Sequence, residues 1–535
     1  MMRRLTVVLT IALMIAGAAW GQQWTVTEER LGQLGGRCDS LVGDRWRSWP
    51  NGDPWLEDCG VPTRLHLTLE IATGDGWAVW HDGQRGPAYG DVCTRVSDDG
   101  SHYAYRACLG DPEAGPWQVL HDGRAGPEFS AVGSFSLSTD GHHLAYAACT
   151  GAQGKGAWRV IVDGQPGPQY DEVSFVRFMP GSDRLVYIAG TGAPQARRWS
   201  VVADGQTGPS FDHVARLELS PDGRHLAYTG RLKTPEGERW HAVLDGQLGP
   251  AYEEIRDLIF SPDGQHLAYE ARTGPARDDG WLVVRDGAPG PELGMVSRIQ
   301  FSPDSRHLAY TARAGTPDER LQRFVIDGAR GPIFRYLHEG LVFSPNGERT
   351  AYVVGVPHEG EAGTMPLVMI DGQPRPQFSS AHSFVFSRDS THLAFVAPAG
   401  PLKPDMWCFV ADGVPGPPYD WIDNLTYSPD NRHLACTARA GTHHFVVLDG
   451  QPGSAFESAH WAQAAVRPPL AFSEDGTHLA YQARAGAKWC VVLDGETGRL
   501  FEEIFPHGPR FVQDGSLQYF GRKGDVVYRV TLTPE

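Results

Sequence analysis

The chain has 535 residues, which is more than a single hydrophobic core normally organises, so several structural units are expected. Hydrophobic residues make up 41% and charged residues 21% of the sequence, a composition that is typical of a globular protein and excludes general disorder. The formal net charge of −17 argues against nucleic acid or an anionic membrane surface as the main partner.

The N-terminus has the pattern of a secretion signal. Two arginines precede an uncharged apolar run, Leu5 to Ala18, and Ala19-Trp20-Gly21 places small residues where a signal peptidase cleaves. We therefore expect residues 1–21 to be a signal peptide and the mature chain to begin at Gln22. The apolar run is shorter than the ~20 residues of a membrane span, which disfavours a transmembrane anchor. The sequence thus predicts export to the periplasm or outside the cell, without membrane insertion after cleavage.

Residues 22–62 form an irregular N-terminal segment that is rich in tryptophan. Trp24 to Arg30 alternates between polar and apolar residues, which predicts a strand. Cys38 and Cys59 bracket the irregular part and are a candidate disulfide, because export permits disulfides. The remaining tryptophans of this segment stand outside the repeat described below and are candidate binding residues: Trp46, Trp49 and Trp55.

An Asp-Gly pair recurs through the rest of the chain. Successive pairs are 37 to 45 residues apart, most often 41. A fixed period of this size indicates a solenoid or a propeller. The aspartates of the pairs are Asp82, Asp122, Asp163, Asp204, Asp245, Asp286, Asp327, Asp371, Asp412, Asp449 and Asp494.

One unit of the repeat contains four short strand-like pieces. Ile259 to Tyr269, with the sequence IFSPDGQHLAY, predicts two strands around a turn, since its proline, aspartate and glycine are turn residues. The third piece is WLVV, which begins at Trp281, and the fourth follows the turn at Asp286. Four antiparallel strands in about 40–45 residues is the size of a propeller blade.

The phrase FSPDG-x-HLAY followed by W-x-V-V-x-DG resembles the blades of TolB-type and WD-repeat-like β-propellers, and also the propeller domains of prolyl oligopeptidases. The resemblance covers nearly the whole mature chain and implies the fold. We expect neither the α/β domain that precedes the propeller in the TolB type nor the hydrolase domain of the oligopeptidases. A G-x-S-x-G elbow is absent from the sequence. The function of either family therefore does not transfer.

We predict an all-β fold of about twelve four-stranded blades. Asp525 to Leu532 supplies a twelfth third strand, and Trp24 to Arg30 would supply the fourth strand of that last blade by pairing the two ends of the chain. Because propellers typically have 4–8 blades, we expect two tandem rings, residues 63–295 and 296–535. One large ring is the alternative.

A histidine opens the second strand of nine units. Equivalent positions lie in different blades, whereas the nitrogen ligands of a zinc ion lie only ~2.0–2.1 Å from it. We therefore expect these histidines to pack or to hydrogen-bond to a neighbouring turn, and we predict neither a metal nor a cofactor. The nine are His66, His102, His143, His225, His266, His307, His392, His433 and His478.

A tryptophan opens the third strand of eight units. These tryptophans would form a sugar-stacking ladder if exposed, but packing between successive blades is the favoured interpretation. They are Trp77, Trp117, Trp158, Trp199, Trp240, Trp281, Trp407 and Trp489.

Two further sets concern the cysteines. Cys93 and Cys108 flank the first hairpin and are a second candidate disulfide. The other cysteines fall within strands and are expected to be buried thiols: Cys149, Cys408, Cys436 and Cys490.

Residues that depart from the repeat are the remaining candidates for binding. The segment between Asp449 and Phe472 is eight residues longer than usual and includes His460 and Trp461, and variable loops on a rigid scaffold often bind ligands. Arg216, Asp257 and Arg298 occupy one equivalent first-strand position, where they would either face a ligand or form salt bridges between neighbouring blades.

No catalytic triad or carboxylate pair can be identified in the sequence, because the repeat accounts for nearly all serines, histidines and acids. We therefore expect a binding or scaffold module without catalysis, whose partner is a protein, a peptide or a glycan. The alternative is a propeller enzyme acting on polysaccharide, as a lyase or a hydrolase.

Overall fold

The computed structural model describes most of the repeat region and part of the N-terminal segment. The described residues are 24–33, 64–73, 76–112, 115–151, 156–235, 237–274, 279–315, 321–357, 364–378, 380–400, 405–457, 470–505 and 508–535. Their secondary structure consists of strands and one short 3-10 helix, Pro194–Ala196. No helix within these ranges has the length and hydropathy to cross a membrane.

Several predictions concern residues outside these ranges. They are the signal peptide of residues 1–21, the candidate disulfide of Cys38 and Cys59, and the candidate binding residues Trp46, Trp49, Trp55, His460 and Trp461.

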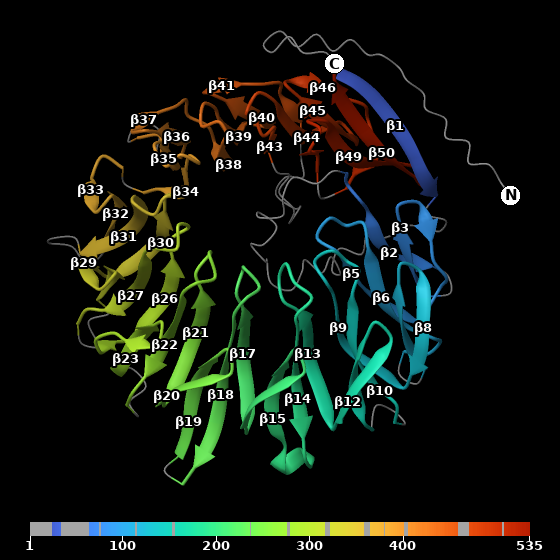
Figure 1. Ribbon diagram of the computed structural model, residues 1–535. Coiled ribbons are helices and arrows are strands. Elements are labelled where there is room, and N and C mark those ends of the chain that lie inside the picture. Colours follow the sequence, from blue (N-terminus) through green and yellow to red (C-terminus); the bar gives the residue numbers. More distant parts are fainter. Residues whose placement is uncertain are drawn as a thin grey trace. The chain divides into compact units, whose positions relative to one another are not determined.

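The described strands form twelve antiparallel sheets, and each sheet is one blade (Figure 1). The first strands of the blades are β5 (Asp91–Val96), β9 (Ala131–Leu137), β13 (Glu172–Phe178), β17 (His213–Leu219), β21 (Glu254–Phe260), β26 (Val296–Phe301), β30 (Tyr336–Phe343), β34 (His382–Phe386), β38 (Trp421–Tyr427), β43 (Ala471–Phe472), and β47 (Glu503–Ile504) with β48 (Arg510–Phe511). The second strands are β2 (Thr68–Thr73), β6 (Tyr103–Cys108), β10 (Leu144–Cys149), β14 (Leu185–Thr191), β18 (Leu226–Thr234), β22 (Leu267–Arg272), β27 (Leu308–Arg313), β31 (Thr350–Pro357), β35 (Leu393–Pro398), β39 (Leu434–Ala440), β44 (Leu479–Ala485) and β49 (Leu517–Lys523).

The third and fourth strands of the blades are given in the same order along the chain. The third strands are β3 (Gly76–His81), β7 (Trp117–His121), β11 (Trp158–Val162), β15 (Arg198–Ala203), β19 (Gly237–Leu244), β23 (Asp279–Arg285), β28 (Gln322–Ile326), β32 (Thr364–Ile370), β36 (Trp407–Ala411), β40 (His443–Leu448), β45 (Lys488–Leu493) and β50 (Val526–Pro534). The fourth strands are β4 (Gln84–Arg85), β8 (Arg124–Phe129), β12 (Gln165–Tyr170), β16 (Gln206–Phe211), β20 (Gln247–Tyr252), β24 (Ala288–Pro289) with β25 (Leu293–Gly294), β29 (Ala329–Phe334), β33 (Gln373–Arg375), β37 (Val414–Pro415), β41 (Gln451–Pro452) with β42 (Phe456–Glu457), β46 (Glu496–Thr497) and β1 (Trp24–Gln33).

The chain divides into two compact units, residues 1–112 with 382–535 and residues 113–381. Within the second unit the first strands of successive blades contact each other, as β17 contacts β21 and β21 contacts β26. The predicted fold class, an all-β propeller of twelve four-stranded blades, is confirmed. The grouping of blades into rings and the division at residues 295 and 296 stay predictions.

Two turns of each blade explain the repeated sequence. In the Asp-Gly turns the aspartates have φ between 42° and 52° and the glycines φ between 72° and 90°, as a two-residue hairpin turn of type I′ requires. In the Ser-Pro-Asp-Gly turn, Ser261 is fully buried, donates to Asp263 Oδ1 at 2.5 Å and accepts the backbone N–H of His266 at 2.9 Å. The serine and the aspartate thus close the hairpin from inside.

The core lies between successive blades. Tyr252 on β20 packs edge to face against Tyr269 on β22 of the next blade, with ring centroids 6.3 Å apart. Tyr252 ends a phrase, Gly-Pro followed two residues later by tyrosine or phenylalanine, that also occurs at residues 126–129 and 167–170. The contact between blades explains why this last residue is aromatic. The predicted packing of the third-strand tryptophans between blades is confirmed at Trp158, Trp199, Trp240, Trp281, Trp407 and Trp489.

The N-terminal strand completes the C-terminal blade. β1 pairs antiparallel with β50, from Trp24 opposite Pro534 to Gln33 opposite Val526 (Figure 1). Trp24 is buried and contacts His478 edge to face at 4.9 Å. The hypothesis that Trp24 to Arg30 supplies the missing fourth strand is therefore confirmed.

The cysteines require one correction. Cys93 lies opposite Arg106, whereas Cys108 lies opposite Asp91, and both thiols are free. The candidate disulfide between them does not form, because the hairpin register separates the two cysteines by two residues along the strands. Burial raises the pKa of the Cys436 thiol to about 12 and that of Cys490 to about 11, so these cysteines are the unreactive buried thiols that the sequence predicts.

Candidate functional site

Eight of the second-strand histidines bind the aspartate of an Asp-Gly turn in the same blade. In each pair the histidine Nδ1 lies 2.6 to 2.8 Å from Oδ2 of the aspartate. The other carboxylate oxygen, as in Asp286, accepts the backbone N–H that follows the histidine, at 2.9 Å. The predicted hydrogen bond to a neighbouring turn is thus confirmed at His66, His143, His225, His266, His307, His392, His433 and His478.

Arginine replaces histidine in two blades without changing this arrangement. Arg184 Nε lies 2.8 Å from Asp204 Oδ2, and Arg349 Nε lies 3.2 Å from Asp371 Oδ2. Because a permanent cation serves equally well, the role of this position is to anchor the turn, and neither catalysis nor metal binding is needed to explain it.

His66, His81 and Asp82 bring ligand-type atoms within 4.8 Å of one another. However, Asp82 Oδ2 also accepts a hydrogen bond from Arg529 Nη2 at 2.9 Å. Burial of Asp82 opposes its ionisation, but the hydrogen bond from His66 and the charge of Arg529 outweigh burial and lower the pKa of Asp82 to about 2. A metal ion would compete with this guanidinium for the same oxygen, so the group is better described as a structural ion pair.

Arg216, Asp257 and Arg298 lie on the first strands β17, β21 and β26 of three successive blades. Each has a positive φ, of 48°, 44° and 58°, and each lies where the first strand shifts register against the second. The residues are therefore bulged, and all three side chains are exposed. Arg216 Nη1 lies 3.6 Å from Asp257 Oδ1, which confirms a salt bridge between neighbouring blades. We call these three residues the bulge row.

Glu270 on β22 is a buried carboxylic acid beside the bulge row. It is 1% exposed, and its Oε1 has no hydrogen-bond partner among the described residues. Burial and the charge of Asp257 raise the pKa of Glu270 to about 8, although Arg256 and Arg216 act in the opposite direction. Glu270 is therefore mostly protonated at neutral pH.

Arg256 stands opposite Glu270 across the two strands but has other partners. Its guanidinium bonds to Glu254 Oε1 at 2.6 Å and lies 4.4 Å from the ring centroid of Trp281. Glu254 is shared between two cations, because Arg272 Nη2 lies 3.2 Å from its other oxygen, Oε2.

Sequence reasoning missed Glu270. The equivalent position is a threonine in three other blades, where the hydroxyl donates to a first-strand carbonyl oxygen at 3.0 Å: Thr229, Thr311 and Thr437. A glutamate at this position was visible in the phrase HLAYEA, but only the register of the strands shows that its carboxyl is buried.

Large exposed apolar residues occur at one equivalent position, just before or at the start of the first strand. Met295 is 41%, Tyr336 is 50% and Trp421 is 47% exposed. Other blades have polar residues there, such as Glu172, His213 and Glu254. Met295 and Tyr336 belong to successive blades of one unit.

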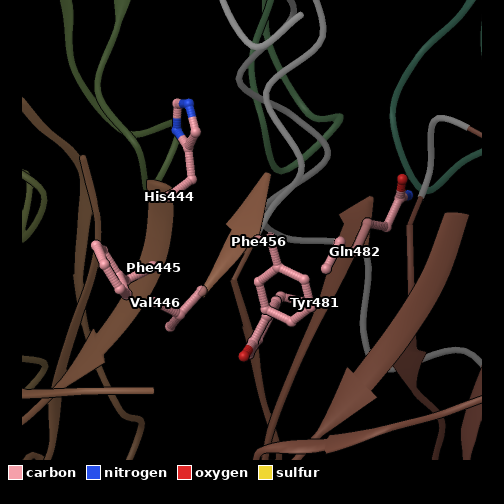
Figure 2. Close-up of a pocket in the computed structure, with 7 residues that line it drawn as sticks. His444, Phe445, Val446, Phe456, Tyr481 and Gln482 are labelled. Atoms are coloured by element: carbon pink, nitrogen blue, oxygen red, sulfur yellow. The ribbon is translucent and has the colours of Figure 1, made fainter. Parts of the chain in front are cut away.

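A small crevice lies between β40, β42 and β44 (Figure 2). Its volume is only about 10 Å³, which holds no more than about one water molecule. Figure 2 shows Phe456 beside Tyr481, and their rings meet edge to face at 6.3 Å. This crevice is part of the packing between blades and is too small for an organic ligand.

The repeated antiparallel sheets and their successive packing define the chain as a β-propeller protein. No protein-family model and no curated protein matches the sequence.

Solved structures that are similar include three propellers. The β-propeller domain of Cps50 (Swd1) from Myceliophteria thermophila has 13% identity, covers 52% of this chain and 98% of its own, and has a TM-score of 0.22. The propeller domain of the Trilobed protease from Pyrococcus furiosus has 10% identity, coverages of 53% and 93%, and a TM-score of 0.26. TolB from Acinetobacter baumannii has 14% identity, coverages of 59% and 81%, and a TM-score of 0.23. The fold assignment rests on the sheets of this chain and not on these likenesses.

Proposed function

We propose that this chain is an exported β-propeller scaffold that binds a protein, peptide or glycan partner without catalysis of its own. The observation that carries the proposal is that the repeated residues stabilise the fold, whereas exposed residues differ from blade to blade. The histidines, aspartates and serines of the repeat are engaged in hydrogen bonds that fix the turns within each blade. Exposed residues at the starts of the first strands differ between blades and include Met295, Tyr336 and Trp421. A rigid frame with variable exposed positions suits partner recognition.

Array binding with surface variants tests this proposal. The mature chain from Gln22 is applied to peptide, protein and glycan arrays, and bound partners are confirmed by titration. Tyr336→Ser or Trp421→Ser should weaken binding of the confirmed partner about tenfold, since aromatic anchors dominate interface energetics. Val414→Ser is the matched control, because Val414 is 69% exposed and lies on a fourth strand. Equal affinity in all three variants, or no partner on any array, would contradict the proposal.

A polysaccharide-directed enzyme is the second candidate, and Glu270 is the observation that favours it. A buried carboxyl group whose pKa is raised to about 8, close to the second carboxyl group of Asp257, is a pairing that acid catalysis uses. Incubation with polysaccharides and mass spectrometry of the products decides between the two functions. Product that disappears in Glu270→Gln supports the enzyme, whereas binding without product in both proteins supports the scaffold.

A further inference from the structure

We propose that the bulge row on β17, β21 and β26 is a binding site for a sugar acid. In this site the guanidinium groups of Arg216 and Arg298 bind the carboxylate, while Asp257 accepts hydrogen bonds from neighbouring hydroxyl groups. The inference rests on the proposed binding function and names one ligand class for it.

The backbone of the bulge row does not explain its side chains. A positive φ at a residue other than glycine favours asparagine and aspartate, which fits Asn424 and Asp257, although the same bulge position also holds Phe175 and Ser383 in other blades. Arginine has no such preference, so Arg216 and Arg298 are not accounted for by the bulge. Bulges re-aim side chains and are frequent next to functional sites.

The contacts of the row leave its cations available. Among the residues that the structure describes, Arg216 has one ion pair, at 3.6 Å to Asp257, and its side chain is 44% exposed. Arg298 is exposed and has no ion-pair partner in the described part of the chain. Two guanidinium groups on either side of one carboxylate thus face solvent on consecutive first strands.

A buried carboxyl group lies next to the bulge row, since Glu270 stands opposite Arg256, the residue before Asp257. Glu270 Oε1 has no hydrogen-bond partner among the described residues, and an unpaired buried polar atom is costly. The charged groups that act on Glu270 are Asp257 and Arg256 on β21 and Arg216 on β17. Its carboxyl therefore lies beside the exposed pair of Arg216 and Asp257.

The charge of the site selects the ligand. Protonated Glu270 is neutral, and the row of two arginines and one aspartate itself has a net charge of +1. This charge favours a ligand with a single carboxylate, which arginine binds in a bidentate manner. Asp257 repels a second anionic group but accepts hydrogen bonds from hydroxyls, which sugar acids supply and acidic peptides lack.

Calorimetric titration of the mature chain at pH 6.5 tests the site with three probes: glucuronate, glucose and tetraglutamate. Glucuronate should bind at least tenfold more tightly than either of the others. Arg298→Ala should weaken glucuronate binding at least tenfold. The matched control is Arg306→Ala, because Arg306 lies in the same blade and its side chain is 80% exposed.

The pH dependence of glucuronate affinity is a second test, because the affinity should not change with pH if Glu270 had only a structural role. Raising the pH from 6.5 to 9 ionises Glu270 and removes the net positive charge, so the affinity of the wild type for glucuronate should fall at least threefold. Glu270→Gln should abolish this loss while binding glucuronate normally at pH 6.5.

Three outcomes would overturn the inference: no glucuronate binding at millimolar concentration, equal binding by Arg298→Ala, or tighter binding of tetraglutamate. If the chain instead binds a peptide or protein through Tyr336 or Trp421, the proposed scaffold function is supported and the proposed sugar-acid site is contradicted. Conversion of a sugar-acid polymer to product would overturn the non-catalytic scaffold but not the binding site.

Discussion

At the scale of single residues, positive φ angles serve two different purposes in this protein. The aspartates of the Asp-Gly turns combine the left-handed backbone with two hydrogen bonds, as Asp286 does with His266 and with the backbone N–H of Leu267. At the bulges of the first strands the same backbone region holds Arg216, Asp257 and Arg298, which have no such local hydrogen bonds to other described residues. The first set is explained by the fold, and the second set is available for binding.

Glu270 should make stability depend on pH in a defined direction. Its pKa is about 8 in the folded state against an ordinary value of 4.5, so the folded state keeps a proton that the unfolded state has lost. Stability therefore falls as the pH rises from about 4.5 to 8, by up to about 5 kcal/mol. Melting temperatures of the wild type and Glu270→Gln, measured at pH 5 and pH 8.5, check this prediction.

The two proteins should be close in melting temperature at pH 5, and the variant should be the more stable one at pH 8.5. Other groups titrate equally in both proteins, so the difference between them isolates Glu270. Parallel pH curves would show that Glu270 is ionised in the folded protein.

Single-residue roles were predictable from the sequence where they depend on local pattern. The turn residues around Pro262 and Gly264 follow from a repeated phrase, and the hydrogen bonds of the histidines follow from their recurrence. Glu270 was not predictable, because its burial depends on how β22 packs against other strands. The pairing of Cys93 with Cys108 failed for a related reason, since it depended on a register that places Cys93 opposite Arg106.

At the scale of elements, Arg529 links three segments of one unit. It is 3% exposed, and it bonds to Glu29 on β1, to Asp82 after β3 and to the backbone oxygen of Leu65. The cation thus joins the N-terminal strand, the first blade and the C-terminal blade. The pairing of β1 with β50 was predictable, because the last unit lacked a strand and Trp24 to Arg30 alternated between polar and apolar residues. The contacts of Arg529 with Glu29, Asp82 and Leu65 were not predictable.

Arg529→Met should destabilise the protein by about 1.5–3 kcal/mol at pH 7, since it removes the charge-assisted hydrogen bond to the half-buried Asp82, although Asp82 keeps His66 and the exposed Glu29 keeps Arg64. The loss should shrink as the pH falls towards the folded-state pKa of Asp82 at about 2, because a protonated Asp82 no longer needs the cation. Chemical denaturation at pH 7 and pH 3 measures both values.

Lys523→Met is the matched control for this prediction. Lys523 lies on β49 of the same sheet, 3.6 Å from Glu28, and its side chain is 38% exposed. A partly exposed pair of this kind contributes about 0–1 kcal/mol. An equal loss in the two variants would show that Arg529 is not a special link between the ends of the chain.

At the scale of the whole molecule, export is the prediction that bears most on which partners are available. Expression of the full chain followed by cell fractionation should place the protein outside the cytoplasm, with Gln22 as the N-terminal residue by mass spectrometry. Deletion of residues 2–21 should retain it in the cytoplasm. A full-length chain that stays in the cytoplasm and retains residues 1–21 would contradict the prediction.

The central claim is that repeat residues hold the fold while residues that break the repeat bind the partner. Thermal stability and glucuronate affinity, measured together on two variants, test this claim most directly. His266→Ala should lower the melting temperature and leave the affinity unchanged, because the hydrogen bond of His266, at 2.8 Å to Asp286, holds a turn of its own blade and its ring stacks on Phe301. Arg298→Ala should lower the affinity at least tenfold and leave the melting temperature unchanged. The reverse pattern, or an equal effect of both variants on both quantities, would contradict the account.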